Sequence, residues 1–282
     1  MGSLDRELRG FLGGGQHVLV EVHMEAARVW LTDYLCGTDP RVGRPGAVCP
    51  FVAPAIRADT LRLELWPVSP RISVTGMMSL VNNMVSVFEG AQWASRNRML
   101  HTLVVVLDGL PLDKLTLTDE AHRQVKPELV ARGLMLGQFH PRCDERAARN
   151  PSFRVSRSPV PMLALRQMAV HDVLFLDGDS RSFTAYDQRY GKRYDSGSVP
   201  DPLFVKHFAR ARARFGEGAA AACASGAGTA VAGDTTGTLV AAHAPPTGDW
   251  SSAGRRLYGL DRTVPRLAAP PSLCPTDSRG AM

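Results

Sequence analysis

The sequence predicts an α+β fold of the ferredoxin-like type, in which helices cover one face of a mixed sheet. Its 282 residues are 44% hydrophobic, which is enough apolar side chain for a sizeable core. Between residues 60 and 168, segments with strand periodicity alternate with segments of helical periodicity. From residue 216 the chain is rich in Gly, Ala and Pro and cannot bury enough apolar surface to fold. We therefore expect one domain over residues 16–215 and a disordered tail over residues 216–282.

The first half of the domain contains a helix, a strand and a second helix. Apolar side chains recur at helical spacing over residues 21–35, and Gly37 follows as a stop signal. Leucines alternate with other side chains over residues 60–68, which is typical of a strand. Residues 75–90 return to helical spacing, with a threonine cap at the start and a glycine at the end.

The second half adds three strands and one helix. Residues 101–107 form a continuous apolar run that is typical of a buried strand. Helical spacing with an acidic first turn follows over residues 118–133, where Pro127 implies a kink or a break. Short apolar runs at residues 134–139 and 161–168 predict two more strands. This order of strands and helices suits an α+β sandwich.

Charge and cysteine content exclude several classes of protein. The net charge is +6, and all of the excess lies before residue 216, where 28 basic residues face 22 acidic ones. No run of Lys or Arg reaches the roughly five to eight residues of a nucleic-acid patch, so we expect no nucleic-acid partner. The five cysteines are widely spaced without a CxxC pair, which argues against disulfides and structural zinc. Without a signal peptide or a membrane-length apolar run, we expect a cytoplasmic protein with no membrane partner.

Three distinctive segments lie where strands or helices end, and such ends gather functional side chains on a rigid frame. Residues 46–51 (GAVCPF) place Cys49 in a loop before a proline. Residues 137–143 (GQFHPRC) place His140 at the end of a predicted strand. Residues 156–162 (SRSPVPM) enter another strand through two prolines.

Taken together, CPF, FHP and RSPxPM with a downstream arginine resemble the motifs of an uncharacterised bacterial family of domains of unknown function. The resemblance covers roughly residues 26–194. The chain is also similar in size and layout to the histidine-ligated haem enzymes that oxidise the side-chain amine of lysine to a nitro group in peptide natural-product pathways. This second resemblance implies a haem cofactor, oxygen or peroxide as co-substrate, and an amino-acid-like substrate.

The haem hypothesis depends on His140. An imidazole followed by a proline at a strand end suits an axial iron ligand, a general base or a hydrogen-bonded structural role. Haem also needs cations for its propionates, which Arg142 and Arg157 would supply, while Arg166 would bind a substrate carboxylate. The wall of the haem pocket would consist of Met84, Phe88 and Phe139. A stripe of Met and Phe at helical spacing is equally typical of ordinary core. The competing histidine ligands are His101 and His122.

We therefore expect a haem-dependent oxidase or oxygenase that acts on the amine of a small amino-acid-like substrate in secondary metabolism. The protein could form a homodimer. Two alternatives remain. A metal-free enzyme would use Cys49 and His140, backed by Asp144 or Asn150, for acyl or thiol chemistry, although the apolar flanks of Cys49 favour packing. A non-catalytic module would instead bind a small anion through the arginines.

Overall fold

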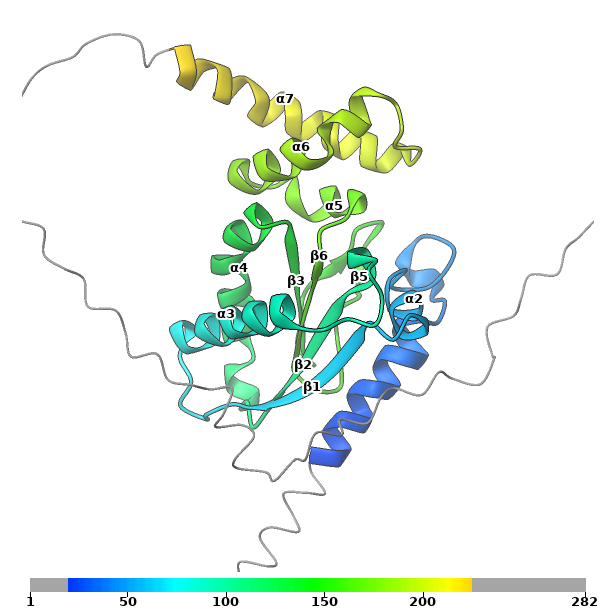
Figure 1. Ribbon diagram of the computed structural model, residues 1–282, viewed down its shortest axis with the longest axis vertical. Helices are drawn as coiled ribbons and strands as arrows, with labels where there is room; N and C mark the ends of the chain where they lie inside the picture. Colours follow the sequence, from blue (N-terminus) through cyan, green and yellow to red (C-terminus); the bar gives the residue numbers. More distant parts are fainter. Residues whose placement is uncertain (1–19, 225–282) are drawn as a thin grey trace, which may run out of the picture. The chain divides into compact units, whose positions relative to one another are not determined.

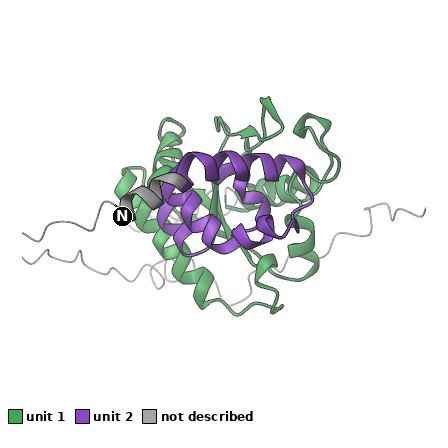
Figure 2. Cartoon of the chain, turned by 90° about the horizontal axis from the view of Figure 1, so that it is seen from above, with its two compact units in different colours: residues 1–125, 134–167, 262–282 green, residues 126–133, 168–261 purple. Residues whose placement is uncertain are grey.

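The computed structural model describes residues 20–224, with side chains up to residue 216 (Figure 1). These residues form two compact units, drawn in different colours in Figure 2. Unit 1 contains residues 20–125 and 134–167, and unit 2 contains residues 126–133 and 168–224. The single domain expected over residues 16–215 stays a prediction.

Unit 1 is built on a four-stranded mixed sheet. Its strands are β1 (Leu61–Pro67), β2 (Thr102–Asp108), β3 (Leu134–Phe139) and β6 (Met162–Gln167). The spatial order is β1-β2-β6-β3, with β1 and β2 parallel and the other pairs antiparallel. All four strands coincide with predicted strands to within one or two residues. The predicted α+β class with a mixed sheet is confirmed.

Helix α3 (Val74–Gly90) covers one face of this sheet, with α4 (Thr116–Ala131) on the same side (Figure 1). The hydroxyl of Ser73 caps α3 by accepting a hydrogen bond from the backbone N–H of Gly76 at 3.2 Å. Met84 and Phe88 are buried on the sheet-facing side of α3. Helix α4 continues through Pro127, where the sequence predicts a kink or a break.

The other face of the sheet is covered by the first helix and by α2 (Val52–Arg57) (Figure 1). The first helix spans residues 20–29 and ends in a π-helical turn, η1 (Trp30–Leu35). Trp30 packs in one apolar cluster with Val104 and Met162 of the sheet. Helices therefore cover both faces, which adds a layer to the single helical face that the sequence predicts.

The remaining elements of unit 1 are short. They are the hairpin of β4 (Arg146–Ala147) and β5 (Asn150–Arg154), and the 3-10 turns η2 (Pro40–Val42), η3 (Arg98–Leu100) and η4 (Leu112–Lys114). No helix in the described part of the chain is long and apolar enough to cross a membrane. Among the described residues, Cys49 and Cys143 are free thiols.

Unit 2 is helical and has an aromatic core. Its elements are η5 (Val170–Asp172), α5 (Val173–Leu176), α6 (Ser180–Asp195) and α7 (Pro202–Ala224). Phe183 and Tyr186 of α6 are buried with Phe208 of α7, and the Phe183 and Phe208 rings lie 5.4 Å apart. Because α7 ends at Ala224, helix occupies the first residues of the expected tail. The rest of that tail, residues 225–282, lies outside the described residues.

Candidate functional site

The segment His-Pro-Arg-Cys at the end of β3 forms a tight turn. The backbone N–H of Cys143 donates to the carbonyl oxygen of His140 at 3.0 Å. Pro141 occupies the second position of this turn, where its fixed φ angle is favourable. The backbone N–H of Ser158, from the double-proline segment, also donates to the His140 carbonyl at 3.4 Å. The local sequence therefore brings Cys143 back beside His140.

The His140 side chain is buried, with a relative exposure of 1%, and its ring is oriented by a carboxylate. Its Nε2 lies 3.0 and 3.1 Å from the two carboxylate oxygens of Asp119, in the first turn of α4. Its Nδ1 is buried without a hydrogen-bond partner. A carboxylate that holds one ring nitrogen and fixes the tautomer is the usual support of a metal-ligating or proton-transferring histidine.

Cys143 completes a cluster of three different donor atoms. Its thiol is fully buried, and Sγ, a ring nitrogen of His140 and a carboxylate oxygen of Asp119 all lie within 4.8 Å of one another. Burial, reinforced by the nearby carboxylates of Asp119, Glu145 and Asp144, raises the pKa of Cys143 to about 11. At neutral pH the thiol is protonated, which suits a poor nucleophile.

Two arginines of the predicted set lie at this cluster. Arg142 belongs to the same turn, is exposed, and donates through one terminal nitrogen to the carbonyl oxygen of Leu112 at 3.4 Å. Arg157 donates through Nε to the carbonyl oxygen of Cys143 at 3.3 Å, while its side chain is 54% exposed. One terminal nitrogen of Arg157 lies 3.8 Å from Asp144, which is itself highly exposed. Both arginines can therefore present positive charge to an anion in solvent beside the buried cluster.

The other predicted pocket residues are not gathered at His140. Met84 and Phe88 pack from α3 on one face of the sheet, whereas Phe139 packs on the other face with its ring 5.2 Å from that of Trp30. Arg166 lies four residues along β6 from Met162, which pairs with Phe139. This separation is about 13 Å of strand. The Arg166 guanidinium stacks on the Phe51 ring at 4.7 Å.

Cys49 lies at the margin of the apolar cluster around Trp30, and its backbone N–H donates to the Leu35 carbonyl at 2.9 Å. The thiol that the structure places beside His140 is Cys143. The competing histidines have other partners. His101 stacks on Trp93 and contacts the carbonyl of Ser95, and His122 contacts the carbonyl of Leu136.

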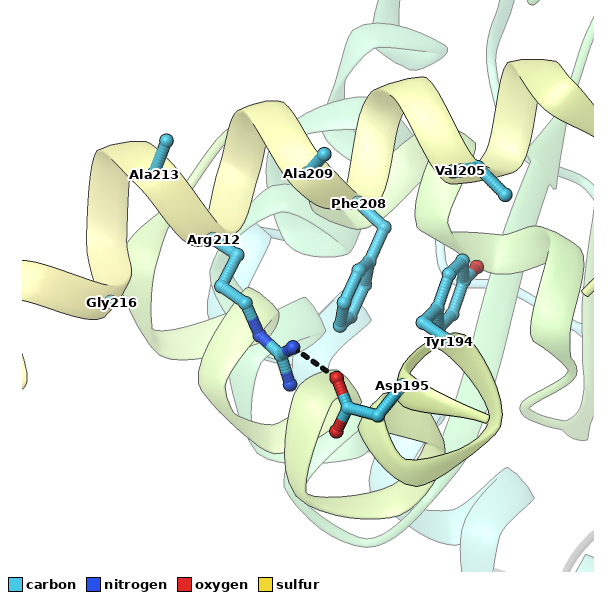
Figure 3. Close-up of a pocket in the computed structure, with 8 residues that line it drawn as sticks. All are labelled: Tyr194, Asp195, Val205, Phe208, Ala209, Arg212, Ala213 and Gly216. Carbon is cyan, nitrogen blue, oxygen red and sulfur yellow. Dashed lines mark hydrogen bonds and ion pairs between the residues drawn. The ribbon is translucent and has the colours of Figure 1, made fainter. Parts of the chain in front are cut away.

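Unit 2 contains a cavity of about 510 Å³ between α6 and α7 (Figure 3). The Arg212 of its lining is paired with two carboxylates, those of Asp195 at 2.5 Å and Asp187 at 2.9 Å. Its lining residues are Tyr194, Asp195, Val205, Phe208, Ala209, Arg212, Ala213 and Gly216. With neither histidine nor cysteine in this lining, the cavity lacks the donor atoms of the cluster in unit 1.

Two residues of the cluster are absent from the predicted site. Cys143 follows His140 by three residues across a proline, so a turn that returns the thiol to the imidazole can be recognised from the sequence. Asp119 precedes His140 by 21 residues. Nothing in the sequence links that carboxylate to that imidazole, because the contact depends on how α4 packs against the end of β3.

Comparison with known proteins gives one match. The model of a family described as a domain of unknown function (DUF6875) matches residues 24–200. This range agrees with the span of the resemblance carried by the three sequence motifs. No curated protein and no solved structure is similar enough to this chain to match it.

Proposed function

The chain belongs to the DUF6875 family of domains of unknown function, and on that premise we propose that it is a metal-dependent oxidoreductase acting on the amine of a small amino-acid-like substrate. One observation carries the metal part of this proposal. His140 is buried, Asp119 holds its Nε2, its Nδ1 has no partner, and a thiol lies beside it. An unpaired buried nitrogen in such a setting is characteristic of a functional site.

Haem is the cofactor that the sequence predicts, and its fit to these residues is partial. The unpaired Nδ1 of His140 suits an axial ligand. The pocket wall does not fit, because the sheet separates Met84 and Phe88 from Phe139. Arg166 stands about 13 Å of strand away from the His140 end of the sheet. We therefore assign the proposed reaction to a metal held by His140 in place of haem.

The reaction class follows from the resemblance to enzymes that oxygenate the lysine side-chain amine. A redox-active metal at His140 would supply activation of oxygen or peroxide. With hydrogen peroxide as oxidant, one oxygen atom is transferred to the amine nitrogen and the other leaves as water, so no separate reductant is needed. The contribution of the chain is to hold the metal and to position the substrate.

The exposed arginines support an anionic group on the substrate. Arg157 bonds to the backbone of Cys143, and Arg142 belongs to the same turn as His140. A carboxylate bound there would hold an amino-acid-like substrate at the edge of the buried cluster. An arginine fork recognises a carboxylate through two parallel hydrogen bonds, which also fixes the orientation of the amine.

Peroxide-driven oxidation of lysine and related amines by the full-length, iron-loaded protein tests the function. We expect an N-oxygenated product detectable by mass spectrometry, lost in His140→Ala and retained in His23→Gln. His23 is a matched control because it forms the second His–Asp pair of unit 1, with Nδ1 2.9 Å from Asp108. Absence of product with all amines tested, in iron-loaded and in haem-loaded protein, would refute the proposed function.

A further inference from the structure

Asp119, His140 and Cys143 present oxygen, nitrogen and sulfur to one point from separate elements. Asp119 comes from α4, His140 from the end of β3, and Cys143 from the turn that follows. The three donor atoms lie within 4.8 Å of one another. Cys143 is fully buried and His140 nearly so, whereas the side chain of Asp119 is 39% exposed. Two of the three side chains are therefore shielded from solvent, and the cluster reaches solvent at Asp119.

Hydrogen bonding within the cluster is incomplete. Nδ1 of His140 is buried without a partner. The Cys143 thiol contacts the backbone, at 3.7 Å to the carbonyl oxygen of Gln138 and through a hydrogen bond with the backbone of Glu145. Buried polar atoms in native proteins are almost always paired, so the protein alone does not satisfy this imidazole fully. A purely structural histidine would be expected to use both ring nitrogens.

The spacing of the donor atoms suits a single small metal ion. Bonds of about 2.0–2.3 Å to nitrogen, oxygen and sulfur in a tetrahedron place the ligand atoms about 3.3–3.7 Å apart. The observed separation of 3.0 Å between Nε2 and Asp119 would have to widen by only a few tenths of an ångström. The distances from Sγ to the other two donor atoms are at most 4.8 Å, so each would have to shorten by no more than about 1.5 Å.

The backbone of both buried ligands is held in place. The His140 carbonyl accepts hydrogen bonds from the N–H groups of Cys143 and Ser158, and the Cys143 carbonyl accepts one from Arg157. Such supports orient metal ligands before the ion binds. The other His–Asp pair of unit 1 offers a contrast. His23 and Asp108 are both partly exposed, and they are not part of a described three-donor cluster.

We propose that Asp119, His140 and Cys143 bind one divalent first-row transition-metal ion, with the fourth coordination position open beside Asp119. Three protein ligands with an open position are typical of catalytic rather than structural metal sites. The mixed donor set suits Fe²⁺, Co²⁺ or Zn²⁺ and disfavours Mg²⁺ and Ca²⁺, which prefer oxygen ligands. This inference rests on the proposed function and deepens it by naming its cofactor as a mononuclear ion in place of haem; of the three ions, Fe²⁺ and Co²⁺ are redox-active as that function requires, whereas Zn²⁺ is not.

Titration of the chelator-treated, full-length protein with Co²⁺ tests the site, because a thiolate bound to Co²⁺ gives a charge-transfer absorption band. We expect one equivalent of Co²⁺ to bind and the band to appear. Cys143→Ser should abolish the band, and Asp119→Asn should weaken binding by at least about tenfold. His23→Gln should leave the band and the affinity unchanged. Circular dichroism verifies that each variant is folded, and Cys143→Ser is nearly isosteric with the natural residue.

Several outcomes would overturn the metal-ion proposal. Absence of the band in the natural protein is one, and a band that survives Cys143→Ser is another. A haem absorption band that depends on His140 would also overturn it, while leaving the proposed oxidoreductase function in place. Conversely, Co²⁺ binding as expected, without amine oxidation by the iron-loaded protein, would retain the site and refute the function.

Discussion

Replacing Asp119 by alanine tests whether this carboxylate satisfies the buried His140 ring. The imidazole is only 1% exposed, so removing the Asp119 carboxylate takes away the acceptor of its Nε2–H at a buried position. An unsatisfied buried donor costs about 1–3 kcal/mol, and the 39% exposure of Asp119 places the effect in the lower half of that range. We expect Asp119→Ala to lower the free energy of unfolding by about 1–2 kcal/mol. Asp119→Asn, which still offers an acceptor oxygen, should cost about 1 kcal/mol or less.

Urea denaturation of chelator-treated protein measures these differences, and a double-mutant cycle isolates the pair. In the His140→Ala background the ring nitrogen is gone, so Asp119→Ala should cost less than about 0.5 kcal/mol. Glu120→Ala is the matched control, because Glu120 is the next residue of α4 and its partner Arg123 is exposed. That control should change stability by less than about 0.5 kcal/mol. Equal costs of Asp119→Ala in the two backgrounds would refute the assigned hydrogen bond.

Three further predictions concern the fold. Leu165→Ala, at a fully buried position of β6, should lower the free energy of unfolding in urea by about 2–5 kcal/mol. Val22→Ala, at a 54% exposed position, should lower it by less than about 0.5 kcal/mol. Similar losses for the two variants would contradict the assigned core. Gly133→Ala should cost about 1–2 kcal/mol by thermal unfolding, because Gly133 has a φ of +74°; a neutral result would exclude this left-handed conformation. A hydrogen bond from Arg212 lowers the pKa of Asp195, so this pair stabilises the folded state above the ordinary carboxyl pKa of 3.8, and its contribution is lost as pH falls through the lowered pKa. The stability difference between the natural protein and Arg212→Met should therefore be present at neutral pH and close in acid; a difference independent of pH would refute the link.

The helices of unit 2 show where periodicity in the sequence is insufficient. Helix α6 buries Phe183 and Tyr186 on one face, but the rest of that helix is strongly polar. Tyr186 donates its hydroxyl to the Val170 carbonyl, so a buried position is occupied by a residue with a polar group. A count of aliphatic side chains at helical spacing therefore finds no signal over this segment, although aromatic residues supply its core.

By itself, the sequence determined the sheet of unit 1 and the position of His140. Strand alternation, apolar runs and helix stop signals depend on neighbours within a few residues, which is why β1, β2, β3 and β6 agree with the predicted ranges. The proline after His140 likewise marks a turn at the strand end. These are local properties of the chain.

Only the tertiary structure decided which residues share a site. The register of β3 with β6 places Phe139 opposite Met162, and this sends Phe139 to one face of the sheet while Met84 and Phe88 pack on the other. The packing of α4 brings Asp119 to His140 across 21 residues of intervening chain. Both results depend on strand parity and helix packing over long sequence separations, which no local pattern encodes. The arrangement therefore replaced an expected haem pocket with a compact cluster of carboxylate, imidazole and thiol.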